Sequence, residues 1–298
     1  YCMGSGMAVS KSFVIWAERY LQNKHFGKHQ ECNTRCLIDK VTRFEDEHKH
    51  PMNIDSMTAD DLRVFADFLS SDYDISMNTI VTNMTLMRTV CNWVRKQGVT
   101  NNDPFFGYDM PKALYGTPYF LTIQERDQVL DADLTDDAEL AEYRDMFVFQ
   151  CMVGCRHSDL VTFTPKNIID GVLEYIPIKT KGKLGDVVRV PLIPKAMAIL
   201  DGHDHGDDEP IFPKHYNFKF NDAIRRILKR AKVNRVVTVI NPKTRLEEKK
   251  PISDVATSHL ARRTFIGNLY RMVKDPDLVA SMSGHAKGSV AFARYRVI

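Results

Sequence analysis

The sequence predicts a mainly helical α+β protein with small β-hairpins in its second half. Apolar residues recur at helical spacing through most of the chain, which is the pattern of amphipathic helices. Two pairs of short segments, around 171–192 and 236–253, have the pattern of strands joined by a polar turn. With 298 residues and 44% hydrophobic content, the chain can form one large or two ordinary domains.

The first hundred residues contain four predicted helices, at 10–24, 33–48, 58–71 and 76–98. Thr58 and Asp61 form a capping-box-like start for the third helix, and Gly98 suits the end of the fourth. Four helices with short connections predict a small helical domain over residues 8–98. Residues 1–7 look like a cloning or numbering remnant and are set aside.

Residues 99–118 contain three Pro and two Gly and have no helical period, which predicts a linker. Three aromatic residues in this linker, Phe105, Phe106 and Tyr108, would be costly to expose, so we expect them to pack against the protein.

A second domain is predicted over residues 119–298. It opens with a helix that Thr122 and Glu125 can cap. A long helix follows, and Gly154 ends it, so that Arg156 comes just after a helix terminus. Taken alone, such an arginine most simply caps the free carbonyl groups of the helix.

Two strands, GVLEYIPI and DVVRVPL, are predicted to form a hairpin through the turn KTKGKLG. All three lysines of that turn could merely contact an anion. A helix over 216–233 carries Arg225, Arg226, Lys229 and Arg230 on one face, and both a solvated surface and contact with phosphate groups remain open for it. A smaller hairpin is predicted near 236–253.

Two places in the sequence could suggest a metal site, but neither is favoured. The cysteine pairs Cys32/Cys36 and Cys151/Cys155 contain no CxxC motif, so they are interpreted as reduced, small apolar core residues. The HDH segment lies among Gly, Pro and Asp residues that are typical of a surface loop. We therefore expect no metal and no cofactor.

The end of the chain concentrates groups that suit a phosphodiester. In a helix predicted over 253–273, His259 and Arg262 lie three residues apart and share one face. A second short helix should end at Gly284 and leave His285 on the following turn. A guanidinium can grip phosphate oxygens, imidazoles can donate hydrogen bonds, and the phenol of Tyr295 can attack phosphorus.

The charge is uneven along the chain. Residues 214–298 hold 19 Lys and Arg against 6 Asp and Glu, a net charge of +13, which leaves −10 for residues 1–213. A strongly basic C-terminal segment, in a chain whose total net charge is only +3, indicates a polyanionic partner.

The segments HLARRTF, MSGHAKGS and AFARYR resemble the C-terminal motifs of the tyrosine recombinase (phage integrase) family, in particular integrases of conjugative transposons. Upstream, CMVGCRHSDLVTFTP and EYIPIKTKGKLGDVVRVPL match the arginine and lysine motifs of the family in the same order. The resemblance implies a helical core-binding domain over 8–98, which forms half of a clamp around DNA, and a mixed α/β catalytic domain over 119–298. Periodicity alone would also allow a helical bundle without a DNA role.

The catalytic set that the resemblance implies is Arg156, Lys179, His259, Arg262, His285 and Tyr295. The tyrosine would form a 3′-phosphotyrosine, the two arginines would neutralise the phosphoryl charge, and the lysine would protonate the leaving 5′-oxygen. Lys181 is a plausible substitute for Lys179, and Lys183 fits least. Asp159 would orient Arg156 or its neighbours.

The implied partners are double-stranded DNA attachment sites and three further copies of the chain, with a Holliday junction as intermediate. Integration or excision of a mobile element is the implied reaction, and an accessory directionality factor is compatible with it. No apolar run approaches the roughly 18 residues of a membrane span. We expect a bacterial cytoplasmic protein associated with the nucleoid.

Two other functions remain open at this point: strand relaxation like that of a type IB topoisomerase, and regulation by a catalytically degenerate DNA-binding protein. The sequence departs from the family pattern in two ways. The spacing from His285 to Tyr295 is one residue longer than the commonest one. Only three residues follow Tyr295, whereas family members continue into a tail that docks on a neighbouring protomer.

Overall fold

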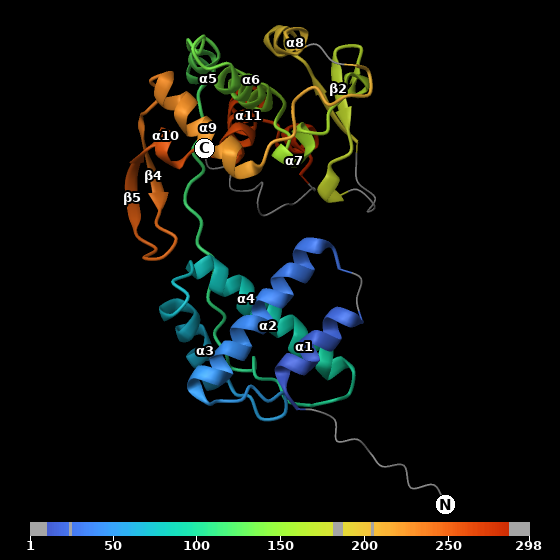
Figure 1. The fold of residues 1–298 in the computed structure, drawn as a ribbon, viewed down its shortest axis with the longest axis vertical. Coiled ribbons are helices and arrows are strands. Elements are labelled where there is room, and N and C mark those ends of the chain that lie inside the picture. Colours follow the sequence, from blue (N-terminus) through green and yellow to red (C-terminus); the bar gives the residue numbers. More distant parts are fainter. Residues whose placement is uncertain (1–10, 24–25, 181–186, 204–205, 286–298) are drawn as a thin grey trace, which may run out of the picture. The chain divides into compact units, whose positions relative to one another are not determined.

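The chain folds into two units, the first comprising residues up to 115 with 240–246, and the second residues 116–239 with 247 onward (Figure 1). The computed structural model describes residues 11–23, 26–180, 187–203 and 206–285. The mainly helical α+β class predicted from the sequence is confirmed. None of the described helices is both long enough and apolar enough to cross a membrane.

The first unit contains α1 (Phe13–Gln22), α2 (Lys28–His48), α3 (Ala59–Ser71) and α4 (Met77–Lys96). All four predicted helices are present, although α2 starts earlier than predicted. The capping box of Thr58 and Asp61 is formed in both directions. The apolar stripes of the four helices close around one core, which includes Phe13, Leu37, Phe44, Leu62, Phe65, Met84 and Met87.

The linker prediction was only partly correct for its aromatic residues. Phe105 is buried and Tyr108 packs against the core of the first unit, but Phe106 is 87% exposed. Phe106 is the fourth residue of the turn that begins at Asp103, whose backbone carbonyl accepts from the Phe106 N–H at 3.0 Å. In this turn the Phe105 ring faces the core and the Phe106 ring faces solvent.

The second unit is built on α6 (Ala138–Val153), which is buried nearly all round from Met146 to Val153. A helix without a polar face lies inside a domain. Around it lie the other helices of the unit: α5 (Ile123–Leu130), α7 (His157–Leu160), α8 (Pro194–Asp201), α9 (Asn217–Arg230), α10 (Ile252–Val255), α11 (Ser258–Val273) and α12 (Pro276–Ser283). The closest packing of α6 is against α11 and α9.

The predicted final helix is in fact two helices. Ala256 has an extended backbone, with ψ at 141°, which interrupts the helix between α10 and α11. Within the apolar stripe that the sequence indicates, Leu260 and Ile266 are buried, but Met272 near the end of α11 is 71% exposed.

Both predicted hairpins are confirmed. β2 (Val172–Tyr175) pairs antiparallel with β3 (Val188–Pro191), with Leu173 opposite Val190. A two-residue strand that the sequence did not reveal, β1 (Ile168–Ile169), extends this sheet beside β2. The 3-10 helices η1 (Pro165–Asn167) and η2 (Ile178–Thr180) flank the strands β1 and β2. The second sheet consists of β4 (Val236–Ile240) and β5 (Glu247–Pro251).

Candidate active site

The carboxyl end of α6 delivers the first site residue. Gly154 ends this helix with φ at 69°, and its N–H donates to the Gln150 carbonyl at 2.9 Å. A side chain there would collide with the ring of Phe265 on α11, since an added Cβ would lie 2.2 Å from its Cδ1. Glycine therefore serves both the left-handed turn and the close approach of α11. Arg156 follows two residues later.

Arg262 lies where three elements of the second unit meet. The side chain projects from α11 and the residue is only 2% exposed. Its Nη1 donates to the Gly154 carbonyl at 2.7 Å, and its Nη2 lies 3.2 Å from Nδ1 and 3.3 Å from Nε2 of His285. A buried guanidinium needs such partners because desolvation of its charge is costly.

His285 occupies the turn after α12, as predicted. Gly284 takes the left-handed conformation with φ at 63°, and the His285 N–H donates to the Ala280 carbonyl at 2.9 Å. The Ser283 hydroxyl donates to the Val279 carbonyl at 2.6 Å and lies 2.9 Å from Nδ1 of His285. The tautomer of His285 sets the roles of its two nitrogens: with the proton on Nε2, Nδ1 accepts from Arg262, and Nε2–H is left to donate to a ligand. Ser283 was not among the residues predicted for the site.

The electrostatics of His285 link four of the predicted residues. Burial lowers the pKa of this imidazole to about 3, and the charges of Arg262, Arg156 and His259 act in the same direction. The structure therefore brings Arg156, His259, Arg262 and His285 into one neighbourhood, with a neutral imidazole at neutral pH. His259 itself is exposed.

Asp159 connects this neighbourhood to the hairpin. The residue is 1% exposed, its carboxylate lies 4.0 Å from Nη1 of Arg156, and Oδ1 accepts from the Ile178 N–H at 2.9 Å. Lys179 follows Ile178 on η2 and is exposed. Asp159 belongs to α7, the short helix that Arg156 precedes. Its carboxylate therefore connects α7 to the start of η2, which carries Lys179.

Three predicted residues cannot be located. Lys181, Lys183 and Tyr295 lie outside the described residues.

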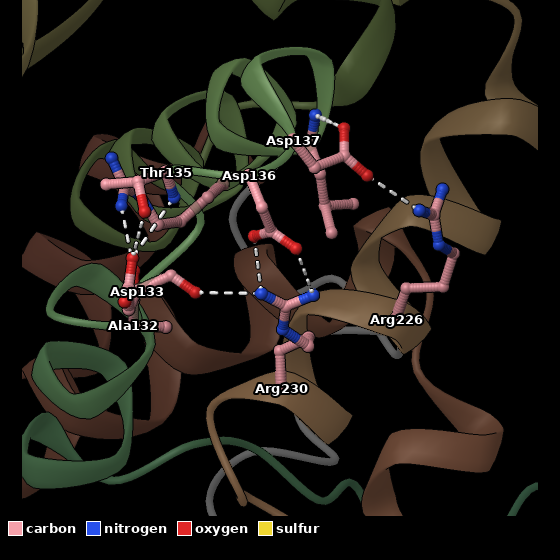
Figure 2. A network of polar contacts seen from close by, with 9 residues as sticks. Ala132, Asp133, Thr135, Asp136, Asp137, Arg226 and Arg230 are labelled. Atoms are coloured by element: carbon pink, nitrogen blue, oxygen red, sulfur yellow. Dashed lines mark hydrogen bonds and ion pairs between the residues drawn. The ribbon is translucent and has the colours of Figure 1, made fainter.

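The basic face predicted for α9 is largely neutralised by carboxylates (Figure 2). Arg230 pairs with Asp136 at 2.6 Å and Arg226 pairs with Asp137 at 2.8 Å. Lys229 pairs with an aspartate of α10 at 2.8 Å. The acidic segment 133–137 therefore neutralises Arg226 and Arg230, two of the four cations that the sequence predicts for phosphate contact or a solvated surface. Sequence spacing could not reveal this pairing, because the partners are about ninety residues apart.

The cysteines follow the apolar interpretation only in part. Cys91, Cys151 and Cys155 are buried, whereas Cys32 and Cys36 are exposed on α2. Among the described residues, no group of three or more His, Cys, Asp or Glu side chains could hold a metal ion.

Comparison with known proteins defines the class. Residues 119–297 match the phage integrase family, and residues 12–110 match the phage integrase SAM-like domain. The first match spans more than half of the chain, so this chain belongs to the phage integrase family. It is a tyrosine-type site-specific DNA recombinase.

Solved structures of integrases share the fold. A lambda integrase dimer bound to a COC′ core site has 14% sequence identity and a TM-score of 0.69, with 95% of this chain and 94% of that chain covered. The Tn1549 transposon integrase in complex with a circular intermediate DNA has 15% identity and a TM-score of 0.70, covering 97% and 99%. A lambda integrase tetramer bound to a Holliday junction has 14% identity and a TM-score of 0.67, covering 97% and 78%. No curated protein sequence matches the chain.

Proposed function

We propose that this recombinase cleaves and rejoins DNA through a 3′-phosphotyrosine at Tyr295, with Arg156, Lys179, His259, Arg262 and His285 as the other catalytic residues. The observation that carries the proposal is the meeting of Arg262 with His285, at 3.2 Å, in the neighbourhood of Arg156 and His259. Two guanidinium groups beside a neutral imidazole suit one phosphate group that gains charge in the transition state.

Each residue takes one role in the proposed step. The phenol oxygen of Tyr295 attacks phosphorus while the bond from phosphorus to the 5′-oxygen breaks. Lys179 gives a proton to that oxygen as general acid, and His259 assists removal of the phenol proton. The arginines stabilise the charge on the non-bridging oxygens, and His285 donates a hydrogen bond to the phosphate.

Rejoining is the same reaction with an exchanged strand. A free 5′-hydroxyl attacks the phosphotyrosine, the bond from phosphorus to the tyrosine oxygen breaks, and the phenol regains its proton. The ester conserves the bond energy, so the reaction needs no high-energy cofactor.

The proposed assembly is four copies of the chain on two DNA duplexes. The solved relatives are described as a dimer on a core site, a tetramer on a Holliday junction and a complex with circular intermediate DNA. By analogy we propose attachment sites of a mobile element as substrate, a core-binding domain over 8–98, a linker over 99–118 and a catalytic domain over 119–298. An accessory directionality factor and a place on the bacterial nucleoid belong to the same proposal.

The test uses a nicked duplex that carries the junction sequence flanking the element, so that a cleaved strand diffuses away and the covalent complex accumulates. The wild-type chain should form a protein–DNA band on a denaturing gel, and Tyr295→Phe should form none. A Tyr270→Phe variant, on α11, serves as the matched control and should keep the band.

Two outcomes would contradict the proposal. Relaxation of supercoiled plasmid regardless of sequence, without strand exchange, would indicate a topoisomerase. Equal DNA activities of the wild type and Tyr295→Phe would indicate a degenerate DNA-binding protein.

A further inference from the structure

Two large aromatic side chains at the amino end of α9 face solvent. Tyr216 is 75% exposed and Phe218 is 69% exposed, and their rings stack with centroids 6.0 Å apart at an interplanar angle of 24°. Single exposed apolar side chains are common, but two exposed rings that stack on each other form a contiguous apolar patch, which is a candidate binding surface. The next aromatic residue, Phe220, is fully buried, so the exposed ring pair is not what anchors α9 in the core.

The ring pair lies beside the candidate active site. Asn217, between the two aromatic residues, has its Oδ1 3.3 Å from the Ser258 hydroxyl. One turn later, Oδ1 of Asn221 accepts from the Ser258 N–H at 2.8 Å. Ser258 begins α11, and His259 follows it. A long ligand bound at the candidate active site would therefore also meet the first turn of α9.

Charge distinguishes the two ends of α9. At the carboxyl end, Arg226 and Arg230 are paired with aspartates (Figure 2). Lys229 is paired with Asp254. At the amino end, Lys214 and Lys219 are exposed, and among the described residues neither lies within ion-pair distance of a carboxylate. The first turn also carries no side-chain cap at Tyr216, so the positive end of the helix dipole adds to the lysine charges. The aromatic end is thus the end that attracts a polyanion.

We propose that α9 enters the major groove of the DNA by its amino-terminal turn, where Tyr216 and Phe218 contact thymine methyl groups and so contribute to the choice of recombination site. The major groove admits an α-helix, and the thymine methyl is the apolar feature of its base edges. The flanking lysines would contact the adjacent phosphates, which position the helix without reading sequence. This inference rests on DNA being the substrate, as proposed above.

The experiment first selects a preferred site for the full-length wild-type chain from a pool of duplexes with a randomised centre. Binding to the selected duplex is then compared with binding to the same duplex carrying deoxyuridine in place of thymine, which removes only the methyl group. The variants are Tyr216→Ser and Phe218→Ser. The matched control is Phe106→Ser, because Phe106 is an equally apolar aromatic residue and 87% exposed but lies in the segment proposed as a linker, outside both α9 and the proposed core-binding domain.

The wild type and Phe106→Ser should lose affinity by about fourfold for each contacted methyl group that is removed, the value of one buried carbon group. Phe218→Ser and Tyr216→Ser should each bind the thymine duplex more weakly. Each should lose about fourfold less affinity than the wild type when uracil replaces thymine, because one methyl contact is already gone. A loss with uracil as large as that of the wild type in both variants would overturn the inference. If the variants bind more weakly but the wild type is not sensitive to uracil, the rings stack on a base instead. If the variants change their oligomeric state but not their DNA preference, the rings contact a protein partner. Either result would refute the methyl contact.

The two proposals fail in different ways. If the wild type selects no site and forms no covalent band, the recombinase proposal fails together with this one. If it selects a site and forms the band, but the aromatic variants select the same site with the same affinity, only the assignment of the ring pair is wrong.

Discussion

At the scale of single residues, the central feature is a buried arginine. Arg262 is the bulkiest of the fully buried side chains among the described residues. Its guanidinium holds the end of α6 through the Gly154 carbonyl and the turn after α12 through His285. A flat, forked group can serve two partners in different directions, which a single ammonium cannot do with the same geometry.

Arg262→Lys should therefore keep the charge and lose the activity. We expect the rate of covalent complex formation to fall about 100-fold, the usual loss for one transition-state donor. Single-turnover cleavage of the nicked duplex measures it. Arg271→Lys, an exposed position on the same helix, is the control and should stay near the wild-type rate. A rate near that of the wild type in Arg262→Lys would mean that Arg262 acts only through its positive charge, which lysine also supplies.

His285 should make stability depend on pH. Burial lowers its pKa to about 3 in the folded chain, whereas an unfolded histidine has a pKa of about 6.5. Between these two values the unfolded chain binds a proton that the folded chain does not, so stability falls as pH decreases through this window and is unaffected above it.

The measurement is urea unfolding followed by circular dichroism at pH values from 7 down to 4. The wild type should lose stability more steeply than His285→Asn, by up to about 1.4 kcal/mol per pH unit. The half-buried His157, whose pKa is also lowered by desolvation, is present in both proteins and cancels in the difference. Parallel pH profiles would show that the imidazole is already solvated.

At the scale of elements, the junction between α6 and α11 positions the site. Gly154 lets the two helices approach until the Phe265 ring covers the helix terminus. The same glycine presents the carbonyl that Arg262 binds. Two residues further along α11 from Phe265, Gly267 allows a close approach of the Phe120 ring, whose nearest atoms lie 2.7 Å from where a Cβ would be. α11 is thus fixed at two positions by glycine–aromatic contacts.

Gly154→Ala should destabilise the second unit by about 2–4 kcal/mol, because left-handed strain adds to overpacking. Gly98→Ala is the matched control: its φ is 71°, and nothing lies within 4 Å of an added Cβ. That variant should cost only about 1 kcal/mol. Thermal unfolding of both variants gives the comparison, and equal losses would mean that Phe265 moves aside without cost.

At the scale of the whole molecule, ion pairs neutralise part of the positive charge that the C-terminal segment carries. The net +13 of residues 214–298 suggests a broad basic surface. Several of these cations are in fact paired with upstream acids, as with Arg230 and Asp136 or Arg235 and Glu125. The cations available to attract DNA are those that no carboxylate neutralises. The position of each cation in the fold therefore matters more than the net charge of the segment.

The salt dependence of DNA binding should separate the two kinds of cation. Raising salt from about 50 to about 200 mM should weaken wild-type binding steeply, as counterion release requires. Lys219→Gln should reduce the slope of log affinity against log salt by about 1. Arg230→Gln should leave the slope unchanged, because its charge is matched by Asp136. Fluorescence anisotropy on a non-specific duplex measures these slopes, and equal slopes for both variants would contradict this division.

The sequence by itself determined the local features of this protein. Helical periodicity and capping residues such as Thr58 and Thr122 gave the main helices, because these signals act over one or two turns. The spacing of His259 from Arg262 and the glycine before His285 are likewise local features of the sequence. The resemblance of these and the upstream motifs to the family then implied the full set of candidate residues.

Only the tertiary structure decided what those residues touch. The contact of Arg262 with Gly154 spans 108 residues, and the contact of Arg226 with Asp137 spans 89. Sequence periodicity carries no information about such pairs, because they depend on how whole helices pack against each other. Long-range packing therefore brought the arginines and His285 together, neutralised one end of α9 and left the other end, with its two exposed rings, open to a partner.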